Sequence, residues 1–197
     1  DILSSVPMIS TGFLLNHFWL GALAVAEEDW AEASREAART DSVAEAMESN
    51  GSDRAAGLAA ERRYALYGEA LREFIRVMRG DDSRLQAFEQ ALAGIPLSSF
   101  HAEFPVYHMK YEVGRRLIER GDIVRAQRYL RSLDPYAHIH YVPAQIQLGR
   151  IYEAMGEPEK ARDHYLIALN WWRDADPYVQ LWRTEVEEAV RRLSPDA

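Results

Sequence analysis

Two arginines in this chain have the chemistry to recognise an anionic group. Arg115 and Arg150 lie 35 residues apart, and a repeat of that period would place them at equivalent positions. A guanidinium group offers a fixed fork of N–H donors that matches carboxylate and phosphate oxygens. Two interpretations stay open. The two arginines form a pair that reads acidic side chains or phosphate, or they pair within the fold with Glu112, Glu119 or Glu153.

Side chains that support catalysis do not occur in catalytic patterns. The chain has no cysteine, which excludes thiolate nucleophiles, disulfides and zinc sites with cysteine ligands. It also lacks the His-Glu-x-x-His zinc motif, the Gly-x-Ser-x-Gly turn and the glycine-rich loops that bind phosphates or dinucleotides. Adjacent carboxylates such as Glu27 and Glu28 are typical of a solvated turn. We therefore predict no enzyme activity, no cofactor and no metal.

The composition is that of an ordinary folded protein with an acidic balance. Of 197 residues, 48% are hydrophobic and 27% are charged, and the formal net charge is -8. An acidic chain argues against nucleic acid as the main partner, because phosphate binding needs clustered Lys and Arg. The sequence starts at Asp1, so we expect a fragment of a longer protein or a processed chain. The expected location is cytoplasmic.

The longest apolar run extends from Met8 to Ala26. It is long enough to span a membrane, but Asn16 and His17 lie at its centre and no basic residues flank it. The missing basic flank also argues against a signal peptide. We predict a buried helix and no transmembrane segment.

The spacing of apolar residues predicts an all-α chain of about nine helices with no strand. Pro7 can open the first helix, and Asp134-Pro135 can end a later hairpin. Residues 1–6 are predicted to be a linker or frayed end, and residues 7–194 a single domain. The predicted elements are four helical hairpins, at about 7–47, 53–94, 103–134 and 140–173, and a C-terminal capping helix at 177–194.

Small residues recur at the interval of 35 residues. Each set contains a glycine that lets two helices approach closely, a glycine that makes the turn, and an alanine that receives the packing of the first helix. The first hairpin keeps part of the pattern, since Gly21 and Ala33 are spaced like Gly149 and Ala161. The second hairpin fits it poorly. The matched positions are Gly114 with Gly149, Gly121 with Gly156, and Ala126 with Ala161.

This pattern resembles the tetratricopeptide repeat (TPR), a unit of two antiparallel helices. Residues 107–177 are similar to two consecutive repeats, and residues 14–47 resemble a degenerate one. The segment WWRDADPYVQLW is similar to the end of TPR regions in large bacterial regulators. In those regulators the TPR region often follows a serine/threonine kinase domain or a DNA-binding activator domain. The best unit, residues 142–173, carries the pattern at Leu148, Gly149, Tyr152, Gly156, Ala161, Tyr165 and Ala168.

The resemblance implies a TPR-like helical-hairpin solenoid that binds peptides or protein surfaces in a concave groove. That groove is lined by the first helix of each hairpin. One TPR subgroup binds the C-terminal carboxylate of its peptide ligand with Lys and Asn at fixed positions of the first helix. In this chain those positions are occupied by other residues. The implied groove residues are His108, Tyr111, Arg115, Glu119, Ile146, Arg150 and Glu153.

The expected function is non-catalytic protein–protein interaction, with the chain as a scaffold for a peptide or protein surface. Two alternatives stay open. One is the sensory or regulatory portion of a larger bacterial kinase or transcription regulator, in contact with an adjoining domain of the same chain. The other is an accessory structural subunit of a large complex.

Two adjacent tryptophans, Trp171 and Trp172, point about 100° apart on a helix. We expect one to pack against the capping helix through Trp182 or Tyr178. If one of the two tryptophans is exposed, two interpretations stay open: it packs within the fold in the ordinary way, or it is an anchor for a partner.

Overall fold

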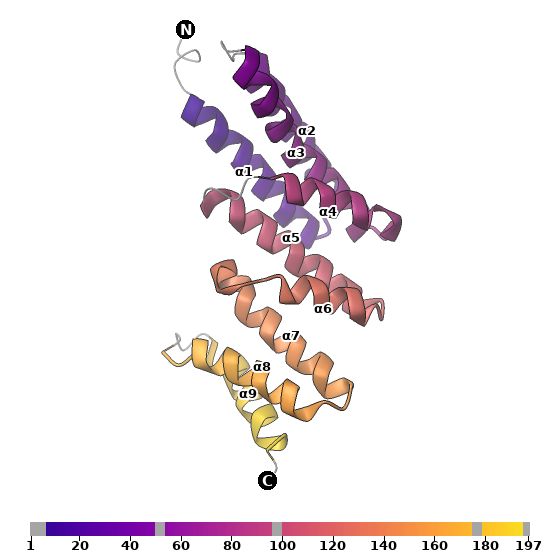
Figure 1. Ribbon diagram of the computed structural model, residues 1–197, viewed down its shortest axis with the longest axis vertical. Helices are drawn as coiled ribbons and strands as arrows, with labels where there is room; N and C mark the ends of the chain where they lie inside the picture. Colours follow the sequence, from indigo (N-terminus) through magenta and orange to yellow (C-terminus); the bar gives the residue numbers. More distant parts are fainter. Residues whose placement is uncertain (1–6, 50–53, 96–99, 175–178, 195–197) are drawn as a thin grey trace. The chain divides into compact units, whose positions relative to one another are not determined.

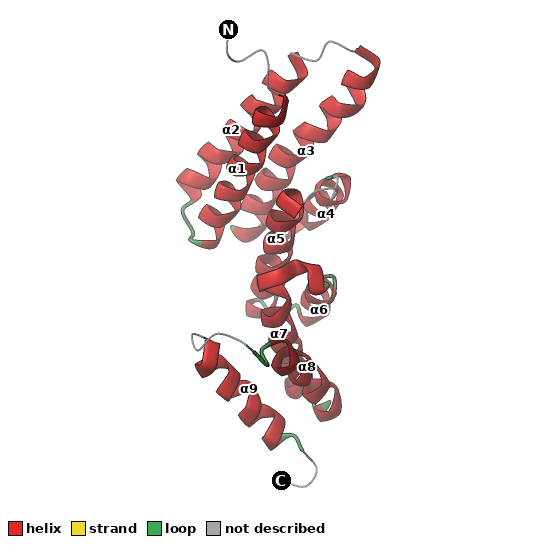
Figure 2. Cartoon of the chain, turned by 90° about the vertical axis from the view of Figure 1, so that its left-hand side faces the viewer, coloured by secondary structure: helices red, strands yellow, loops and turns green. Residues whose placement is uncertain are grey.

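The structure is a computed structural model, and its described residues are 7–49, 54–95, 100–174 and 179–194. All regular secondary structure in these residues is helical (Figure 2), which confirms the predicted all-α class. The predicted linker at 1–6 lies outside the described residues. The α-helices are α1 (Pro7–Ala26), α2 (Trp30–Ser49), α3 (Arg54–Met78), α4 (Leu85–Gly94), α5 (Phe100–Glu119), α6 (Ile123–Arg131), α7 (Tyr141–Ala154), α8 (Pro158–Trp171) and α9 (Gln180–Arg192).

The chain divides into two compact units, residues Asp1–Met109 and Lys110–Ala197, with the boundary inside α5. Each unit is described by itself, and the predicted single domain over 7–194 stays a prediction. Two short 3-10 helices, η2 (Asp82–Arg84) and η3 (Pro135–His140), immediately precede α4 and α7.

In the first unit, α1, α2 and α3 pack against one another (Figure 1). α1 contributes fully buried side chains such as Leu14 and Phe18. His17, a polar residue at the centre of the apolar run, forms a hydrogen bond with Glu36 of α2 at 2.6 Å, and Glu36 is only 1% exposed. No helix in the described part of the chain is long and apolar enough to cross a membrane.

The turns after α5 and α7 have the same backbone structure, 35 residues apart. Gly121 and Gly156 have positive φ angles of 77° and 72°. The next residue in each turn donates its N–H back across the glycine over 2.9 Å, from Asp122 to the carbonyl of Leu117 and from Glu157 to that of Tyr152. These are the bonds of a Schellman helix end, in which a left-handed residue, usually glycine, follows the helix.

The two turns in the first unit repeat this bonding. After α1, Asp29 donates to the carbonyl of Ala24 at 2.9 Å, and the left-handed position is held by Glu28 with φ of 59°. After α3, Gly80 has φ of 113° and the following amide also donates back into the helix. The second hairpin, which fits the sequence repeat poorly, therefore has the same kind of turn.

The second unit holds α6 to α9 and the C-terminal half of α5. A Cβ at Gly149 of α7 would lie 2.5 Å from Cε1 of Tyr165 in α8, and one at Gly114 of α5 would lie 3.1 Å from Leu130 in α6. Helix α9 adds Val186 and Ala189 to the same core. The close approach of paired helices thus depends on these glycines.

Candidate binding surface on the second unit

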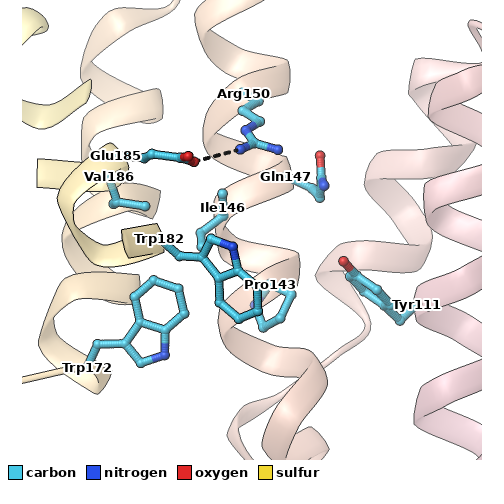
Figure 3. A pocket seen from close by; sticks show the side chains of 9 residues that line it. All are labelled: Tyr111, Pro143, Ile146, Gln147, Arg150, Trp172, Trp182, Glu185 and Val186. Carbon is cyan, nitrogen blue, oxygen red and sulfur yellow. Dashed lines mark ion pairs between the residues drawn. The ribbon is translucent and has the colours of Figure 1, made fainter. Parts of the chain in front are cut away.

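A pocket of about 230 Å³ lies where α5, α7 and α9 face one another (Figure 3). α5 contributes one side chain, α7 contributes four, and the remainder come from α9 and the end of α8. The pocket is lined by Tyr111, Pro143, Ile146, Gln147, Arg150, Trp172, Trp182, Glu185 and Val186.

One side of the pocket is apolar. Trp172 and Trp182 lie near each other there, with Pro143 and Ile146 of α7 beside them (Figure 3). Trp182 is 53% exposed, although it is one of the largest apolar side chains in the unit. Val186, one turn further along α9, is buried in the core and fixes that helix face. An exposed tryptophan on a fixed helix can receive an apolar group from a partner.

The other side of the pocket is polar. Arg150 of α7 faces Glu185 of α9 at 3.9 Å (Figure 3), and both side chains are more than half exposed. A pair at this distance in water is weak, so both groups can exchange partners. Gln147 lies on the same face of α7 and lines the pocket with Tyr111.

The ring of His140 stacks against that of Tyr111 and holds it in place. The two rings stack with centroids 5.4 Å apart and planes 28° from parallel. Burial, followed by the charge of Glu112, raises the pKa of Tyr111 above its ordinary value. The phenol therefore stays neutral at physiological pH and offers a hydroxyl group, not a phenolate, to the pocket.

A second pocket of about 190 Å³ continues along the same two helices, α7 and α9, and shares Ile146, Arg150, Glu185 and Val186 with the first. Glu153 is one of its lining residues. It accepts hydrogen bonds from Arg192 at 2.7 Å and from the hydroxyl of Tyr165 at 3.1 Å. The bond from Arg192 is the main reason why the pKa of Glu153 lies below its ordinary value.

Tyr165 supports this carboxylate from the core. Burial, and after it the hydrogen bond to Glu153, raises the pKa of Tyr165 to about 12. Glu153 is therefore occupied by Arg192 and Tyr165, and it is not the partner of Arg150.

The two arginines of the predicted pair have different surroundings. Arg115 is held by two carboxylates of its own helix, Glu112 at 3.0 Å and Glu119 at 3.3 Å. These contacts match the interpretation that it pairs within the fold. Among the carboxylates that the structure describes, Arg150 contacts Glu185 of α9 alone, at 3.9 Å, so it is the more available cation.

The structure brings together some of the predicted groove residues. Tyr111, Ile146 and Arg150 line the first pocket and Glu153 lines the second, whereas Arg115 and Glu119 line neither. His108 belongs to the first unit, where it is 6% exposed and meets the ring of Trp19 edge-on at 5.2 Å.

The sequence analysis did not predict that the binding surface also includes Pro143, Gln147, Glu185 and Val186. The two tryptophans carried a signal, since one of Trp171 and Trp172 was expected to meet the capping helix. Trp172 does so in the pocket with Trp182, and Trp171 instead packs edge-on against Tyr141 with centroids 5.4 Å apart. The other candidate contact, Tyr178, lies outside the described residues.

The described residues contain no group of three or more His, Asp or Glu side chains placed to hold a metal ion. The chain matches no protein-family model, no curated protein and no solved structure.

Proposed function

We propose that the second unit is a TPR-like pair of helical hairpins with a capping helix, and that it binds a peptide segment of a partner protein without catalysis. The main support is the pocket in which Trp182 and Trp172 face α7. Clustered, partly exposed aromatic side chains in a hollow are typical of the anchor positions that carry most binding energy in protein interfaces.

The size of the pocket favours a single side chain as the anchor. At about 230 Å³ it is smaller than the roughly 300–1,000 Å³ common for pockets that enclose small molecules. Its apolar side suits one large aliphatic or aromatic residue. The second pocket lengthens the surface along α7 and α9, so the ligand extends beyond its anchor.

The polar side suits the remainder of a peptide. Gln147 offers both donors and an acceptor, and Arg150, one turn further along α7, offers only donors. A bound peptide must satisfy the N–H and C=O groups that it withdraws from water. Side chains of this kind in a row along one helix can do so without regard to the peptide's sequence.

The ionisable groups around the pockets support binding over catalysis. Glu153 is engaged by two hydrogen bonds, and its lowered pKa keeps it ionised and unsuited to general acid chemistry. The raised pKa values of Tyr111 and Tyr165 keep both phenols protonated.

The proposal can be tested with a phage library of random short peptides, selected on the intact chain. We expect enriched peptides to share one large apolar residue. Trp182→Ala should weaken a selected peptide about tenfold or more, as loss of an anchor does. Trp171→Ala is the matched control, because Trp171 is 50% exposed and does not line either pocket.

Two results would contradict the proposal. One is the absence of any enriched peptide. The other is an equal loss of binding in the Trp182 and Trp171 variants while both keep the helical circular dichroism of the wild type.

A further inference from the structure

A third pocket, of about 320 Å³, lies in the first unit between α2 and α3, which pack side by side (Figure 1). α3 lines one side of it with three arginines and Ile75, and α2 lines the other side with small side chains and Asp41. Its volume falls within the roughly 300–1,000 Å³ common for pockets that enclose small molecules. This α2–α3 pocket is separate from the proposed peptide site, which belongs to the second unit.

The three arginines of the pocket, Arg72, Arg76 and Arg79, follow one face of α3 at intervals of four and three residues. They concentrate positive charge in an acidic unit, because residues 1–109 contain 17 acidic and nine basic side chains. Like charges at this spacing repel one another and destabilise a helix. The arrangement thus has a cost that an anion bound between the arginines removes.

Arg79 keeps its hydrogen-bond donors for a ligand. Its guanidinium carbon lies 5.9 Å from the ring centroid of Trp30, and a ring attracts a cation without accepting conventional hydrogen bonds from its N–H groups. Among the residues that the structure describes, no carboxylate pairs with Arg79, and its side chain is exposed. A ligand in the pocket therefore meets an arginine that it need not detach from a carboxylate.

Arg76 has an internal partner that does not depend on it. Its Nη1 donates to Oε1 of Glu73 at 2.7 Å, but Arg84 already donates to both oxygens of Glu73, at 2.7 Å from Nε and 2.6 Å from Nη2. The bond from Arg84 is also the first cause that lowers the pKa of Glu73. A guanidinium has five N–H donors, and the side chain of Arg76 is 52% exposed. Arg76 therefore retains donors for the pocket while Glu73 stays paired.

Asp41 is an internal anion of the pocket. It forms an ion pair with Arg72 from the opposite helix, and its side chain is 34% exposed. Among the described residues it is the one carboxylate of the lining, so three arginines and one aspartate give the pocket a formal charge of +2. A ligand anion has to compete with Asp41 for Arg72 alone.

We infer that the α2–α3 pocket binds a small phosphorylated organic molecule by its phosphate group. A phosphomonoester carries a charge of about -1.5 to -2 near neutral pH and has three strong acceptor oxygens, which match the charge and the donors of the lining. Guanidinium groups bind phosphate oxygens in a bidentate manner. Ala37, Ala38 and Ile75 provide an apolar surface for the carbon part of the ligand.

A nucleic acid suits this pocket less well than a small phosphate ester. The first unit has eight more acidic than basic side chains, so a polyanion that extends beyond the pocket is repelled. Nucleic-acid binding also needs basic side chains clustered along a face or a helix, whereas these three arginines surround a single hollow.

The test is isothermal titration calorimetry of the intact chain with phenyl phosphate, at low salt and in a buffer without phosphate. We expect saturable binding of one molecule per chain, which weakens as salt rises. Inorganic phosphate has the charge without the carbon part, and benzoate has the ring with a single charge, so both should bind more weakly. Arg79→Ala should weaken the binding of phenyl phosphate about tenfold, since bonds to a charged group are lost. Arg79→Lys keeps the charge without the fork, and its affinity should fall between that of Arg79→Ala and that of the wild type.

Asp41→Asn should strengthen binding, because it removes the anion that competes for Arg72 and keeps the shape of the side chain. Its matched control is Glu45→Gln, since Glu45 lies one turn further along α2, is exposed and does not line the pocket. Arg35→Ala is the control for the loss of a positive charge. Arg35 is exposed on α2, pairs with Glu32 and lies outside the lining. Both controls should leave the affinity unchanged.

Four outcomes would overturn the inference, each measured on variants that keep the helical circular dichroism of the wild type. Phenyl phosphate does not bind in a saturable manner. Arg79→Ala binds it as tightly as Arg35→Ala does, or Asp41→Asn binds it no more tightly than Glu45→Gln does. Inorganic phosphate or benzoate binds as tightly as phenyl phosphate, which makes the ligand a simple anion. A single DNA strand binds more tightly and needs Arg79, which makes the occupant a nucleic acid.

Discussion

Gly149 lies so close to the ring of Tyr165 that a Cβ at position 149 would come 2.5 Å from Cε1 of that ring. The ring has little freedom to withdraw, because Tyr165 is 3% exposed and its hydroxyl donates to Glu153. The same contact therefore holds α7 against α8 and positions the carboxylate of Glu153, which lines the second pocket.

Gly149→Ala should destabilise the second unit. Alanine gains about 1 kcal/mol of helix propensity over glycine, but overpacking of a core commonly costs about 1–3 kcal/mol, and the fixed ring favours the upper end. We expect a net loss of about 1–2 kcal/mol in urea unfolding. Gly114→Ala is the control, since the nearest atoms there, Cδ2 and Cγ of Leu130, lie 3.1 Å away, further than the ring of Tyr165 from position 149. An equal effect of both substitutions would show that the rigidity of the ring is unimportant.

Glu28→Gly should stabilise the first unit. Glu28 has φ of 59° at the turn position that Gly121 and Gly156 hold in the second unit. The left-handed conformation costs a residue with a Cβ roughly 1 kcal/mol, and glycine avoids this cost. We expect a gain of about 0.5–1 kcal/mol in the free energy of unfolding. Glu27→Gly, one residue earlier and without a positive φ, should instead reduce stability, and a gain there would refute the explanation.

The helices and the repeat of small residues were predictable because both follow from the spacing of apolar and small residues close together in the sequence. Gly121 and Gly156 mark turns that the structure forms with matching bonds. The turn at Gly80 has the same bonding, but the residues around it lack the small-residue pattern. Hydrogen bonds between main-chain atoms specify such a turn, so any residue that tolerates a positive φ can serve, as Glu28 does.

The pocket was less predictable, because three of its nine lining residues come from α9. A repeat pattern assigns groove positions only to helices that belong to the pattern, here those with Tyr111, Ile146 and Arg150. The capping helix has no repeat to align with. The expected contact of Trp171 or Trp172 with Trp182 was a sequence signal for one side of the pocket, but no pattern placed Glu185 opposite Arg150. The depth of burial of His108 depends on its contact with Trp19, from a helix distant in sequence.

Alkaline pH should test the burial of Tyr165. Its pKa is raised from 10.0 to about 12, so the folded state holds the phenol proton where the unfolded state releases it. The stabilisation is complete below pH 10, and it is lost as the pH rises through 10 towards 12. Tyr165→Phe cannot titrate at this position. The wild type should therefore be the more stable protein at neutral pH, because of the bond to Glu153, and should lose that advantage in alkali.

The measurement is the midpoint of urea unfolding for both proteins across this pH range. Other tyrosines and lysines titrate in both proteins alike, so they cancel in the difference. A constant difference between wild type and variant would mean that Tyr165 has an ordinary pKa in the folded state.

Charge reversal should separate the roles of Arg115 and Arg150. Arg115 is already paired with Glu112 and Glu119. For Arg150, the carboxylate nearby in the described part of the chain is that of Glu185, at 3.9 Å. For a peptide selected on the wild type that carries an acidic residue, Arg150→Glu should weaken binding about tenfold or more. Arg115→Glu should change the affinity little, although it places three carboxylates together on α5 and should lower the unfolding midpoint. Equal losses of affinity would instead support two arginines that read one anion, and unchanged binding in both variants would remove Arg150 from the site.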